Sequence, residues 1–387
     1  MRLPGHPLPP AFCQLRGSGQ EEIGMKAAVI GAGMMGWAAA YDLVHNPEVE
    51  RVKIIDQNPQ ALGSLKTFLD SDKVELDLSD LQKKSASDLL RGYDCAISCA
   101  PYSFNYRLAK AAVSAGCNFV DLGGNNEVVQ QELSLHEEAQ KQKVLVVPDC
   151  GLAPGLVSVL TKILVEELGN AESIHLRVGG LPQKPQLPLN YALVFSVQGL
   201  VNEYVEDCVA LRDGKKVIIP PMQELERLKF PIYGELEART TSGGSSTLAD
   251  TYEGKVKNLD YKTIRYPGHF EKYLELQNSI GDRATLEKTL LNMLPKGKED
   301  VILLRAAGEG NGRKIQYQMI DHYDPKTGLT AMMRTTAFPA TILAAMIGTG
   351  KIDVKGAYTQ EHFAPAQQII DELAKRGVEI SKRLYLG

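Results

Sequence analysis

The sequence predicts an α/β fold with two domains: a doubly wound parallel sheet, then an α+β domain with a mainly antiparallel sheet. Three observations support this prediction. Short apolar strands alternate with helical segments from residue 25 to about residue 150, which is typical of a parallel sheet covered by helices. After residue 173 the chain becomes rich in strands and hairpin turns, which indicates antiparallel pairing. The 387 residues are enough for two domains with a large buried core.

The first predicted strand, residues 25–30, runs directly into a glycine-rich turn and then into a helix. The turn has the pattern G-x-G-x-x-G, with glycines at Gly31, Gly33 and Gly36. The first glycine permits the tight bend, the second lets backbone approach a pyrophosphate, and the third lets the helix pack close to the strand. The helix N-terminus, at Met34 and Met35, would point its free N–H groups at phosphate. This pattern predicts the nucleotide-binding turn of a Rossmann domain.

An acidic residue ends the second predicted strand, residues 52–56. Asp56 lies about twenty residues beyond the glycines, where an acid binds the ribose 2′-hydroxyl. Its charge would repel a 2′-phosphate, and Gln57 and Asn58 add no cation, so the sequence predicts NAD rather than NADP. The alternative is that Asp56 caps the helix that begins near Pro59, and both roles can coexist in one structure.

The rest of the first domain continues the alternation. Helices are predicted over residues 59–69, 85–91, 105–115 and 126–141, and strands over 73–77, 93–99, 118–121 and 143–147. Ligands of such sheets bind outside the carboxyl ends of the strands. This rule places Asp121 and Asp149 along one cleft with Asp56. It also predicts cofactor contacts by Asp77 and Leu78 at the adenine end, and by Ala100, Pro101 and Tyr102 where the dinucleotide crosses the sheet.

The second half of the chain has hairpin signals at residues 213–214, 310–312 and 324–328. Three consecutive antiparallel strands are predicted over 301–307, 314–323 and 329–335, and the apolar helix 338–347 is predicted to pack back on the first domain. The predicted boundaries are therefore a NAD-binding domain over 25–150, a substrate and oligomerisation domain over 151–336, and returning helices over 337–387. Residues 1–24, rich in Pro and Gly, are predicted to be a disordered or mis-called extension.

Composition narrows the class of protein. The formal net charge of −4 and the lack of a basic block argue against a nucleic-acid partner, and no apolar run approaches the length of a membrane span. The six cysteines form no C-x-x-C pair, which indicates reduced thiols and a cytoplasmic location. The seven histidines have no metal-ligand spacing, so no metal is predicted.

Four segments together resemble the saccharopine dehydrogenase-like family. They are D-C-G-L-A-P-G-L at 149–156, V-G-G-L-P at 178–182, R-Y-P-G-H at 265–269 and T-T-A-F-P-A at 335–340. The G-G-L-P segment, the region of Tyr191 and the overall length resemble the members that oxidise the ε-amine of L-lysine. The resemblance implies NAD-dependent oxidative deamination of this amine to allysine, which cyclises to 1-piperideine-6-carboxylate, with release of ammonia and NADH. Analogy at the level of the fold implies a homo-oligomer.

Asp149 is the first candidate for acid/base chemistry and for orienting the substrate. It follows a strand and precedes a loop in which Gly151, Pro154 and Gly155 fix the backbone, so its carboxylate could hold an ammonium group and later a water. Capping the helix after Pro154 is the alternative. Asp121 has the same strand-end position and could hold the nicotinamide ribose or the substrate amine, or could form only loop hydrogen bonds.

The R-Y-P-G-H segment adds His269, which in the resemblance helps proton transfer, although a satisfied histidine at a helix start is an alternative. Arg239 and Arg265 are candidates to bind the α-carboxylate, because a guanidinium can bind a carboxylate through two hydrogen bonds. A surface ion pair is the alternative for either arginine. Tyr191 is a weaker substrate-binding candidate, and Cys150 is interpreted as a small buried residue.

Two other functions remain open. A saccharopine or carboxynorspermidine dehydrogenase would share the fold and the cofactor, but its substrate carries further carboxylates and would need several convergent cations. A non-catalytic NAD-binding sensor or scaffold would bind its partner without Asp149, and no amine would reduce NAD in its presence.

Overall fold

The first structural unit is built on a seven-stranded parallel sheet with the strand order β15-β6-β5-β4-β1-β2-β3. In the computed structural model, which describes residues 24–386, this unit comprises the chain up to Gly155 together with Thr336–Pro365. The prediction about residues 1–24 lies, apart from Gly24, outside the described residues. The strands are β1 (Met25–Ile30), β2 (Val49–Asp56), β3 (Val74–Leu78), β4 (Cys95–Ser98), β5 (Asn118–Asp121), β6 (Leu145–Val147) and β15 (Gly356–Ala357).

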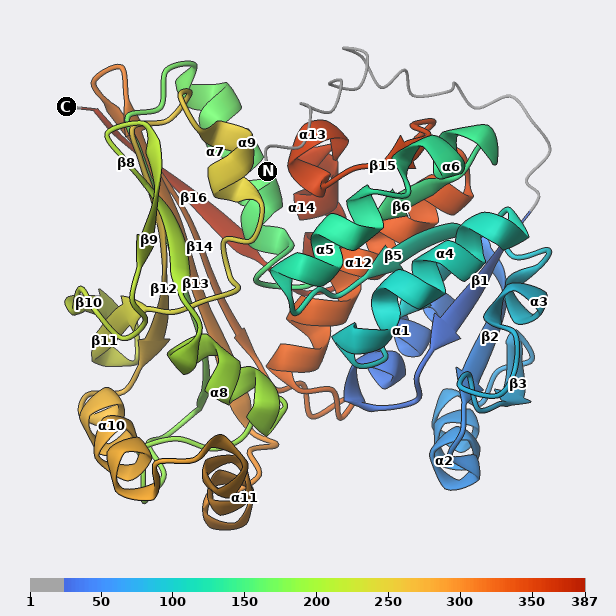
Figure 1. Cartoon of the computed structure of the whole chain (residues 1–387), viewed down its shortest axis with the longest axis horizontal. Helices are drawn as coiled ribbons and strands as arrows, with labels where there is room; N and C mark the ends of the chain where they lie inside the picture. The colour runs from blue at the N-terminus through green and yellow to red at the C-terminus, as the bar shows by residue number, and fades with distance from the viewer. Residues whose placement is uncertain (1–23, 387) are drawn as a thin grey trace. The chain divides into compact units, whose positions relative to one another are not determined.

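Helices cover this sheet on both faces (Figure 1). They are α1 (Met34–His45), α2 (Pro59–Leu69), α3 (Ala86–Leu90), the 3₁₀ turn η1 (Tyr102–Phe104), α4 (Asn105–Ala115), α5 (Asn126–Leu133), α6 (His136–Lys141), α13 (Gln360–Phe363) and most of α12 (Ala331–Gly348). The rings of Trp37 and Phe68 stack at 5.0 Å and join α1 to α2, while α4 packs against α3 and α5. The predicted doubly wound sheet is confirmed.

One predicted helix of this unit is wrong in its extent. The single helix expected over 126–141 is two helices, because α5 ends at Leu133 and α6 begins at His136. At the break the Ser134 hydroxyl donates to the Gln131 carbonyl at 2.6 Å, and the Leu135 N–H bonds the carbonyl three residues earlier, at Glu132. This tighter turn buries Leu135, which is 3% exposed and lies in the core of the unit.

Helix α12 packs against the first unit, as predicted. The Thr341 hydroxyl donates to Asp42 Oδ2 on α1 at 2.6 Å, and both side chains are buried. Among the described residues, α12 alone is long and apolar enough to cross a membrane by length and composition, yet 89% of it is buried inside the protein. A helix that is buried to this extent is a core helix of the protein.

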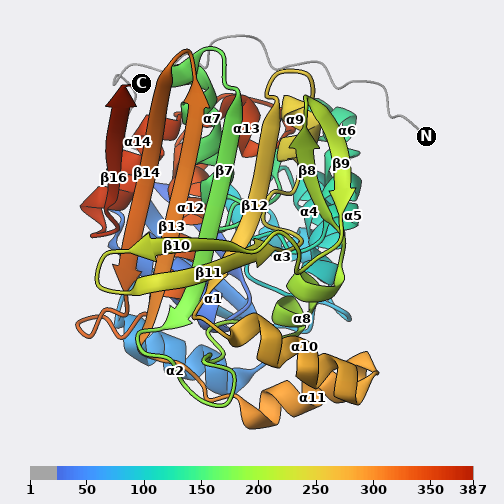
Figure 2. The same cartoon turned by 90° about the vertical axis from the view of Figure 1, so that its left-hand side faces the viewer.

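The second unit comprises Leu156–Thr335 and the last described residues from Ala366. Its nine-stranded sheet has the order β10-β11-β12-β7-β13-β14-β16, with β8 and β9 attached through β12 (Figure 2). Only the pair β12–β7 is parallel, so the predicted, mainly antiparallel sheet is confirmed. The strands are β7 (Ser173–Pro182), β8 (Cys208–Arg212), β9 (Lys215–Ile219), β10 (Glu226–Phe230), β11 (Gly234–Thr240), β12 (Asn258–Arg265), β13 (Asp300–Gly310), β14 (Arg313–His322) and β16 (Ile380–Leu386).

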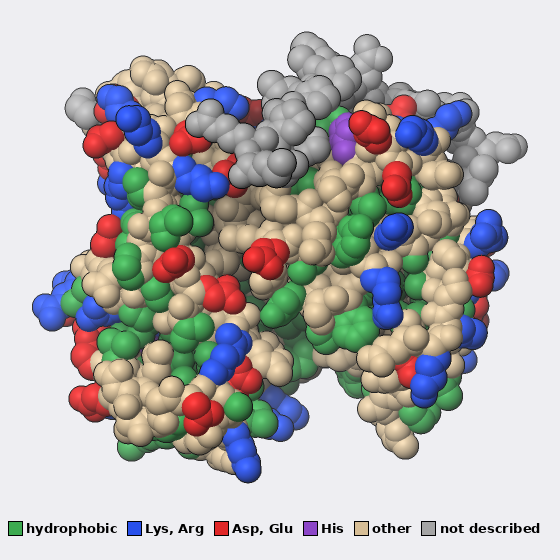
Figure 3. All heavy atoms as spheres, viewed as in Figure 1, with side chains coloured by type: hydrophobic (Ala, Val, Ile, Leu, Met, Phe, Trp, Pro, Cys, Tyr) green, Lys and Arg blue, Asp and Glu red, His purple; other side chains and the backbone are tan. Residues whose placement is uncertain are grey.

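The helices of the second unit are α7 (Leu156–Leu168), α8 (Val197–Val205), α9 (Leu248–Tyr252), α10 (His269–Ile280), α11 (Arg283–Met293) and α14 (Ala366–Lys375). Helix α14 packs on α7, and β16 pairs with β14. The segment after Pro365 therefore lies in the second unit, whereas the sequence suggested a return to the first. Charged side chains of both signs are interspersed over the face of each unit seen in Figure 3.

The third predicted strand of the second half, 329–335, is wrong. Residues 331–335 form the first part of α12, and the strand beside β14 is β16 instead. The cause is a tertiary cap: the buried Asp300 carboxylate accepts the N–H groups of Ala331 at 2.6 Å and of Met332 at 2.8 Å. The cap satisfies two of the donors that a helix N-terminus leaves open, and it comes from a residue 31 positions earlier, which local patterns do not register.

A second buried acid near this cap gives the unit a pH-dependent stability. Asp321 is 5% exposed, and burial raises its pKa to about 7, although Arg334 lies 3.3 Å away. Because the folded pKa lies above the unfolded value of about 3.9, the stability that the protonated acid contributes is complete below pH ~4 and is lost as the pH rises through about 7. We expect Asp321→Asn to flatten the decline of the unfolding free energy between pH 4 and 8 by about 4 kcal/mol, measured by urea unfolding.

Asp324→Asn is the matched control, because Asp324 faces the same arginine at 3.7 Å. Burial raises the pKa of Asp324, but hydrogen bonds from the Lys326 N–H and the Thr327 hydroxyl and the charge of Arg334 together outweigh burial, so the pKa is lowered. Its contribution to stability is therefore present above pH ~4 and is lost on acidification, the opposite direction. Equal pH profiles for the two variants would contradict the prediction.

Candidate active site

The glycine-rich turn between β1 and α1 has the shape that a dinucleotide requires. Gly31 has φ +103°, and a Cβ there would lie 2.9 Å from the Cys99 carbonyl oxygen; a Cβ at Gly36 would lie 1.8 Å from the Gly31 carbonyl oxygen. At Gly33, in contrast, a Cβ would meet nothing within 4 Å. The first and third glycines are therefore required by packing, and the second leaves open space beside the N-terminus of α1, where a pyrophosphate fits.

Asp56 ends β2 beside this turn and is half-buried. Its carboxylate oxygens accept the N–H of Ala32 at 2.6 Å and the N–H of Asn58 at 2.7 Å, so the acid fixes the glycine turn itself. The alternative that Asp56 caps the next helix is wrong. Asn58 caps α2, and its side chain accepts the N–H groups of Gln60 and Ala61. Binding of a ribose by Asp56 remains a prediction.

The other predicted cofactor contacts follow strand ends of the same unit. Asp77 accepts the Ser79 hydroxyl and lies 3.7 Å from the Lys84 ammonium, while Leu78 is 59% exposed. Beyond β4, the chain passes Ala100 and Pro101 and enters η1 at Tyr102. The Tyr102 side chain lies against Gly124, where a Cβ would come within 3.1 Å of it. Met34 is exposed and Met35 half-buried at the start of α1.

Asp149 follows β6 and is held in an unusual backbone conformation. Its φ is +62°, in the left-handed region, and it is 5% exposed. Its N–H donates to Asp121 Oδ1 at 3.2 Å, and its carbonyl accepts the Gln360 side-chain amide at 2.7 Å. Gly123, with φ +82°, makes room for the carboxylate, since a Cβ there would lie 2.2 Å from Asp149 Oδ1. Strained backbone held by several contacts is typical of functional positions.

The structure thus brings Asp121 and Asp149 together, 28 positions apart in sequence. Asp121 is fully buried; its Oδ1 also accepts the Gly123 N–H at 2.6 Å, and its carbonyl accepts the Cys150 N–H at 2.7 Å. Burial raises the pKa of Asp121. Cys150 is a fully buried residue, as predicted, and its thiol lies 3.3 Å from the Val147 carbonyl.

Two residues of this part of the structure, Gln360 and Glu132, were not identified from the sequence. Gln360 begins α13, more than two hundred positions beyond Asp149, and nothing near it in the sequence points to this contact. Glu132 is buried on α5 three residues after the buried Val129. That spacing places the acid on the apolar face of the helix, which is the signal that could have revealed it.

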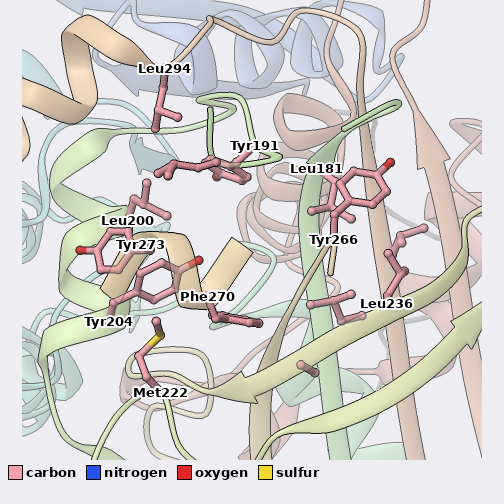
Figure 4. Close-up of a cluster of buried hydrophobic side chains, with 14 of the residues drawn as sticks. Leu181, Tyr191, Leu200, Tyr204, Met222, Leu236, Tyr266, Phe270, Tyr273 and Leu294 are labelled. Atoms are coloured by element: carbon pink, nitrogen blue, oxygen red, sulfur yellow. The ribbon is translucent and has the colours of Figure 1, made fainter. Parts of the chain in front are cut away.

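In the second unit, three further candidates come together. The rings of Tyr191 and His269 lie 5.1 Å apart, and the Arg265 guanidinium lies 4.9 Å from the centre of the Tyr191 ring. All three are at most 1% exposed. Tyr191 belongs to the hydrophobic core around α8 and α10, together with Tyr204, Phe270 and Tyr273 (Figure 4), and the His269 ring and the Arg265 guanidinium lie against Tyr204.

A chain of hydrogen bonds runs through this cluster. Arg265 Nε donates to the Tyr204 hydroxyl at 2.7 Å, which lies 2.9 Å from His269 Nε2. His269 Nδ1 lies 2.9 Å from the Leu189 carbonyl, which can only accept, so Nδ1 carries the proton and Nε2 accepts from Tyr204. Burial, and then the charge of Arg265, lowers the pKa of His269 to about 3, so this imidazole is neutral at working pH.

The two candidate arginines already have acidic partners. Arg265 lies 3.1 Å from Glu203 in an ion pair whose arginine is buried and whose glutamate is partly exposed, which differs from the surface pair considered as the alternative. Arg239 lies on β11, and its guanidinium reaches Glu271 at 3.0 Å and the Met222 carbonyl at 3.0 Å. Its Nε is buried and has no acceptor among the residues that the structure describes. Binding of a substrate carboxylate stays a prediction for both.

A glycine turn with this geometry at the carboxyl edge of a doubly wound sheet, followed by an α+β domain, is typical of two-domain nucleotide-dependent oxidoreductases. Comparison with family models agrees. Residues 27–147 match the saccharopine dehydrogenase NADP binding domain, and residues 151–378 match the saccharopine dehydrogenase C-terminal domain. The chain belongs to the saccharopine dehydrogenase family and is an NAD(P)-dependent oxidoreductase.

Solved structures show the same fold. Apo saccharopine dehydrogenase (L-Glu forming) from Saccharomyces cerevisiae is 18% identical with a TM-score of 0.74, and the match covers 94% of this chain and 100% of the yeast chain. Homospermidine synthase from Legionella pneumophila, in complex with NAD, is 13% identical with a TM-score of 0.71, covering 94% of this chain and 91% of that one.

Proposed function

We propose that the protein is a lysine 6-dehydrogenase, which oxidises the ε-amine of L-lysine with NAD. The observation that carries this proposal is the pair of strand-end acids Asp121 and Asp149 in the nucleotide-binding unit. The backbone N–H of Asp149 donates to the Asp121 carboxylate and holds the two residues together. A loop built from two carboxyl groups favours a cationic ammonium group over an anionic one. The resemblance of the G-G-L-P segment to lysine-oxidising members supports the same substrate.

Asp56 supports NAD as the cofactor. Its two oxygens accept backbone N–H groups of the glycine turn and of Asn58, and these bonds hold the carboxylate at the end of β2, the position that would repel a 2′-phosphate. Gly31, Gly33 and Gly36 would hold the pyrophosphate, and bound NAD supplies a hydride acceptor. We expect NADP to bind more weakly than NAD.

In the proposed reaction Asp149 holds the substrate ammonium and orients it. Loss of a proton from nitrogen and of a hydride from the ε-carbon gives an imine, and Asp149 then orients the water that attacks it. L-lysine, NAD⁺ and water thus give allysine, ammonium, NADH and one proton. The unperturbed amine has a pKa of about 10.4, so only a small fraction is free amine at neutral pH.

Three arginines already form ion pairs with acidic side chains of the protein, and this favours lysine over substrates with more carboxylates. Arg265 is paired with Glu203, Arg239 with Glu271, and the buried Arg177 with Asp260. Saccharopine carries an additional dicarboxylate arm, which would have to compete with these acids for the same guanidinium groups. Lysine presents one carboxylate, for which the unpartnered Arg239 Nε is a candidate donor.

A panel of amines tests the proposal. Protein beginning at Met25 is incubated with NAD or NADP and with L-lysine, L-ornithine, saccharopine, carboxynorspermidine or L-glutamate, and NADH absorbance is followed. We expect a signal with lysine and NAD, and a cyclic imine trapped by an aromatic aldehyde. A signal with saccharopine alone would keep the family and overturn the substrate. If NAD binds but no amine of the panel produces NADH, the result would favour the non-catalytic alternative.

The pH profile of the lysine reaction is a separate prediction. Because the amine must lose a proton before the hydride leaves, we expect kcat/KM to rise by about tenfold per pH unit below the pKa of the amine, ~10.4, until another group limits it. His269 contributes no step between pH 6 and 10, because its pKa is lowered to about 3. A flat profile from pH 6 to pH 10 would contradict the proposed chemistry.

A further inference from the structure

Two carboxyl groups meet in the interior of the first unit. Asp121 at the end of β5 and Glu132 on α5 are both 0% exposed, and they lie within hydrogen-bonding reach of one another. Among the residues that the structure describes, no N–H or O–H group donates to Asp121 Oδ2 or to either oxygen of Glu132. Asp121 Oδ2 and the Glu132 carboxyl group therefore face each other without a donor from any other residue that the structure describes.

Such an arrangement requires a proton. Two ionised carboxylates in contact repel one another, and each would also lose its hydration, which is costly for an unpaired charge in the interior. A carboxyl group donates a hydrogen bond only when protonated. One proton between the two groups removes one charge and supplies the missing donor in the same step.

The surroundings place that proton on Glu132. Asp121 Oδ1 accepts two backbone N–H groups, from Gly123 at 2.6 Å and from Asp149 at 3.2 Å, and such bonds favour the ionised form of the acceptor. Glu132 accepts none among the described residues. We infer that Glu132 is protonated at neutral and alkaline pH and donates its O–H to Asp121, so that the pair holds one negative charge and fixes the backbone of Asp149.

The other titratable groups around the pair agree with this assignment. Burial raises the pKa of Glu132, and the charges of Asp121 and Asp149 raise it further. The Cys150 thiol also stays neutral, because burial and the same acids raise its pKa. On the flanking helices, Arg107 and Lys110 of α4 are exposed, and the ring of His136 on α6 lies 3.2 Å from the Ala357 carbonyl.

Glu132 is thus a positioning residue for Asp149. Asp121 holds the Asp149 N–H, and Gln360 holds its carbonyl, so both sides of a residue with φ +62° are fixed. Without a donor from Glu132, Asp121 Oδ2 would be buried with no partner, and the carboxylate would turn away from the Asp149 N–H. The protonation of Glu132 stands without the proposed function; only its effect on catalysis rests on it.

Infrared spectroscopy tests the proton directly. At pH 9 Asp300 and Asp321 are ionised, since burial raises their pKa values only to about 6 and about 7. We expect the wild-type protein at pH 9 to show the carbonyl stretch of a protonated carboxyl, shifted in heavy water, and Glu132→Gln to lack it. A spectrum without a band that depends on Glu132 would overturn the inference. No substrate is needed, so failure of the proposed function leaves this result unaffected.

Activity with lysine tests the positioning. Glu132→Gln keeps the size and an N–H donor, so we expect kcat within about threefold of wild type and an unchanged pH profile. Glu132→Leu removes the donor, and we expect a loss of at least about tenfold in kcat. Glu127→Leu, on the exposed face of the same helix, is the control for the loss of an acid. A large loss of kcat or a shifted pH profile in Glu132→Gln would show that Glu132 is ionised and would contradict the inference. If Glu132→Leu does not fold, the result with Glu132→Gln decides the test.

Discussion

Asp149→Asn is expected to lower kcat with lysine by about 10²–10⁴-fold, the range for loss of an acid/base group, while leaving NAD binding unchanged. The amide keeps the size of the side chain and tolerates the left-handed φ of +62°. It removes the negative charge that would hold the ammonium group and the oxygen that would orient the water. Initial rates at saturating lysine, together with NAD titration, measure the two effects separately.

Asp70→Asn is the matched control for this variant. Asp70 is also an aspartate in the left-handed region, with φ +40°, but it is exposed at the C-terminus of α2. The same chemical change at the same kind of backbone should leave kcat at the wild-type value. If Asp149→Asn kept full activity with a normal unfolding temperature, Asp149 would have no part in the chemistry.

Gly33→Ala is expected to weaken NAD binding by about tenfold or more, with little change in the unfolding temperature. The Cβ at this position enters open space, so the folded protein meets no clash. That space is where the backbone would approach a pyrophosphate, and a methyl group there keeps the phosphates from the N–H groups of α1. Calorimetric titration with NAD and a thermal melt check the two halves of the prediction.

Gly63→Ala is the control, because Gly63 is an exposed glycine of α2 whose Cβ would likewise meet nothing within 4 Å. Alanine in a helix interior favours folding by up to about 1 kcal/mol over glycine, so this variant should bind NAD normally and melt slightly higher. Normal NAD affinity in Gly33→Ala would show that the cofactor does not use this turn.

The sequence predicted the first unit well because its signals are local. The strand over 118–121 and the helices over 59–69 and 105–115 have the predicted bounds, since each is an apolar run or an amphipathic period between turn residues. The predictions of one helix over 126–141 and of a strand over 329–335 were wrong for the same reason. A side chain elsewhere in the chain, or a burial requirement, decides the local structure: Leu135 enters the core, and Asp300 caps α12.

The candidate site divides in the same way. Gly31, Gly33, Gly36 and Asp56 could be assigned by spacing alone, because one short segment of backbone forms the whole turn. The juxtaposition of Asp121 with Asp149 followed from the rule that parallel strands end at one edge of the sheet, and the hydrogen bond between them confirms their proximity.

By itself the sequence determined the fold class, the nucleotide-binding turn and the strand ends that carry acidic residues. Only the tertiary structure decided which contacts hold those acids: Gln360 on the Asp149 carbonyl, Glu132 against Asp121, and the buried chain from Arg265 through Tyr204 to His269. The physical reason is that periodicity and glycine spacing act over a few residues. Burial of a charge depends on every segment packed around it, however distant in sequence.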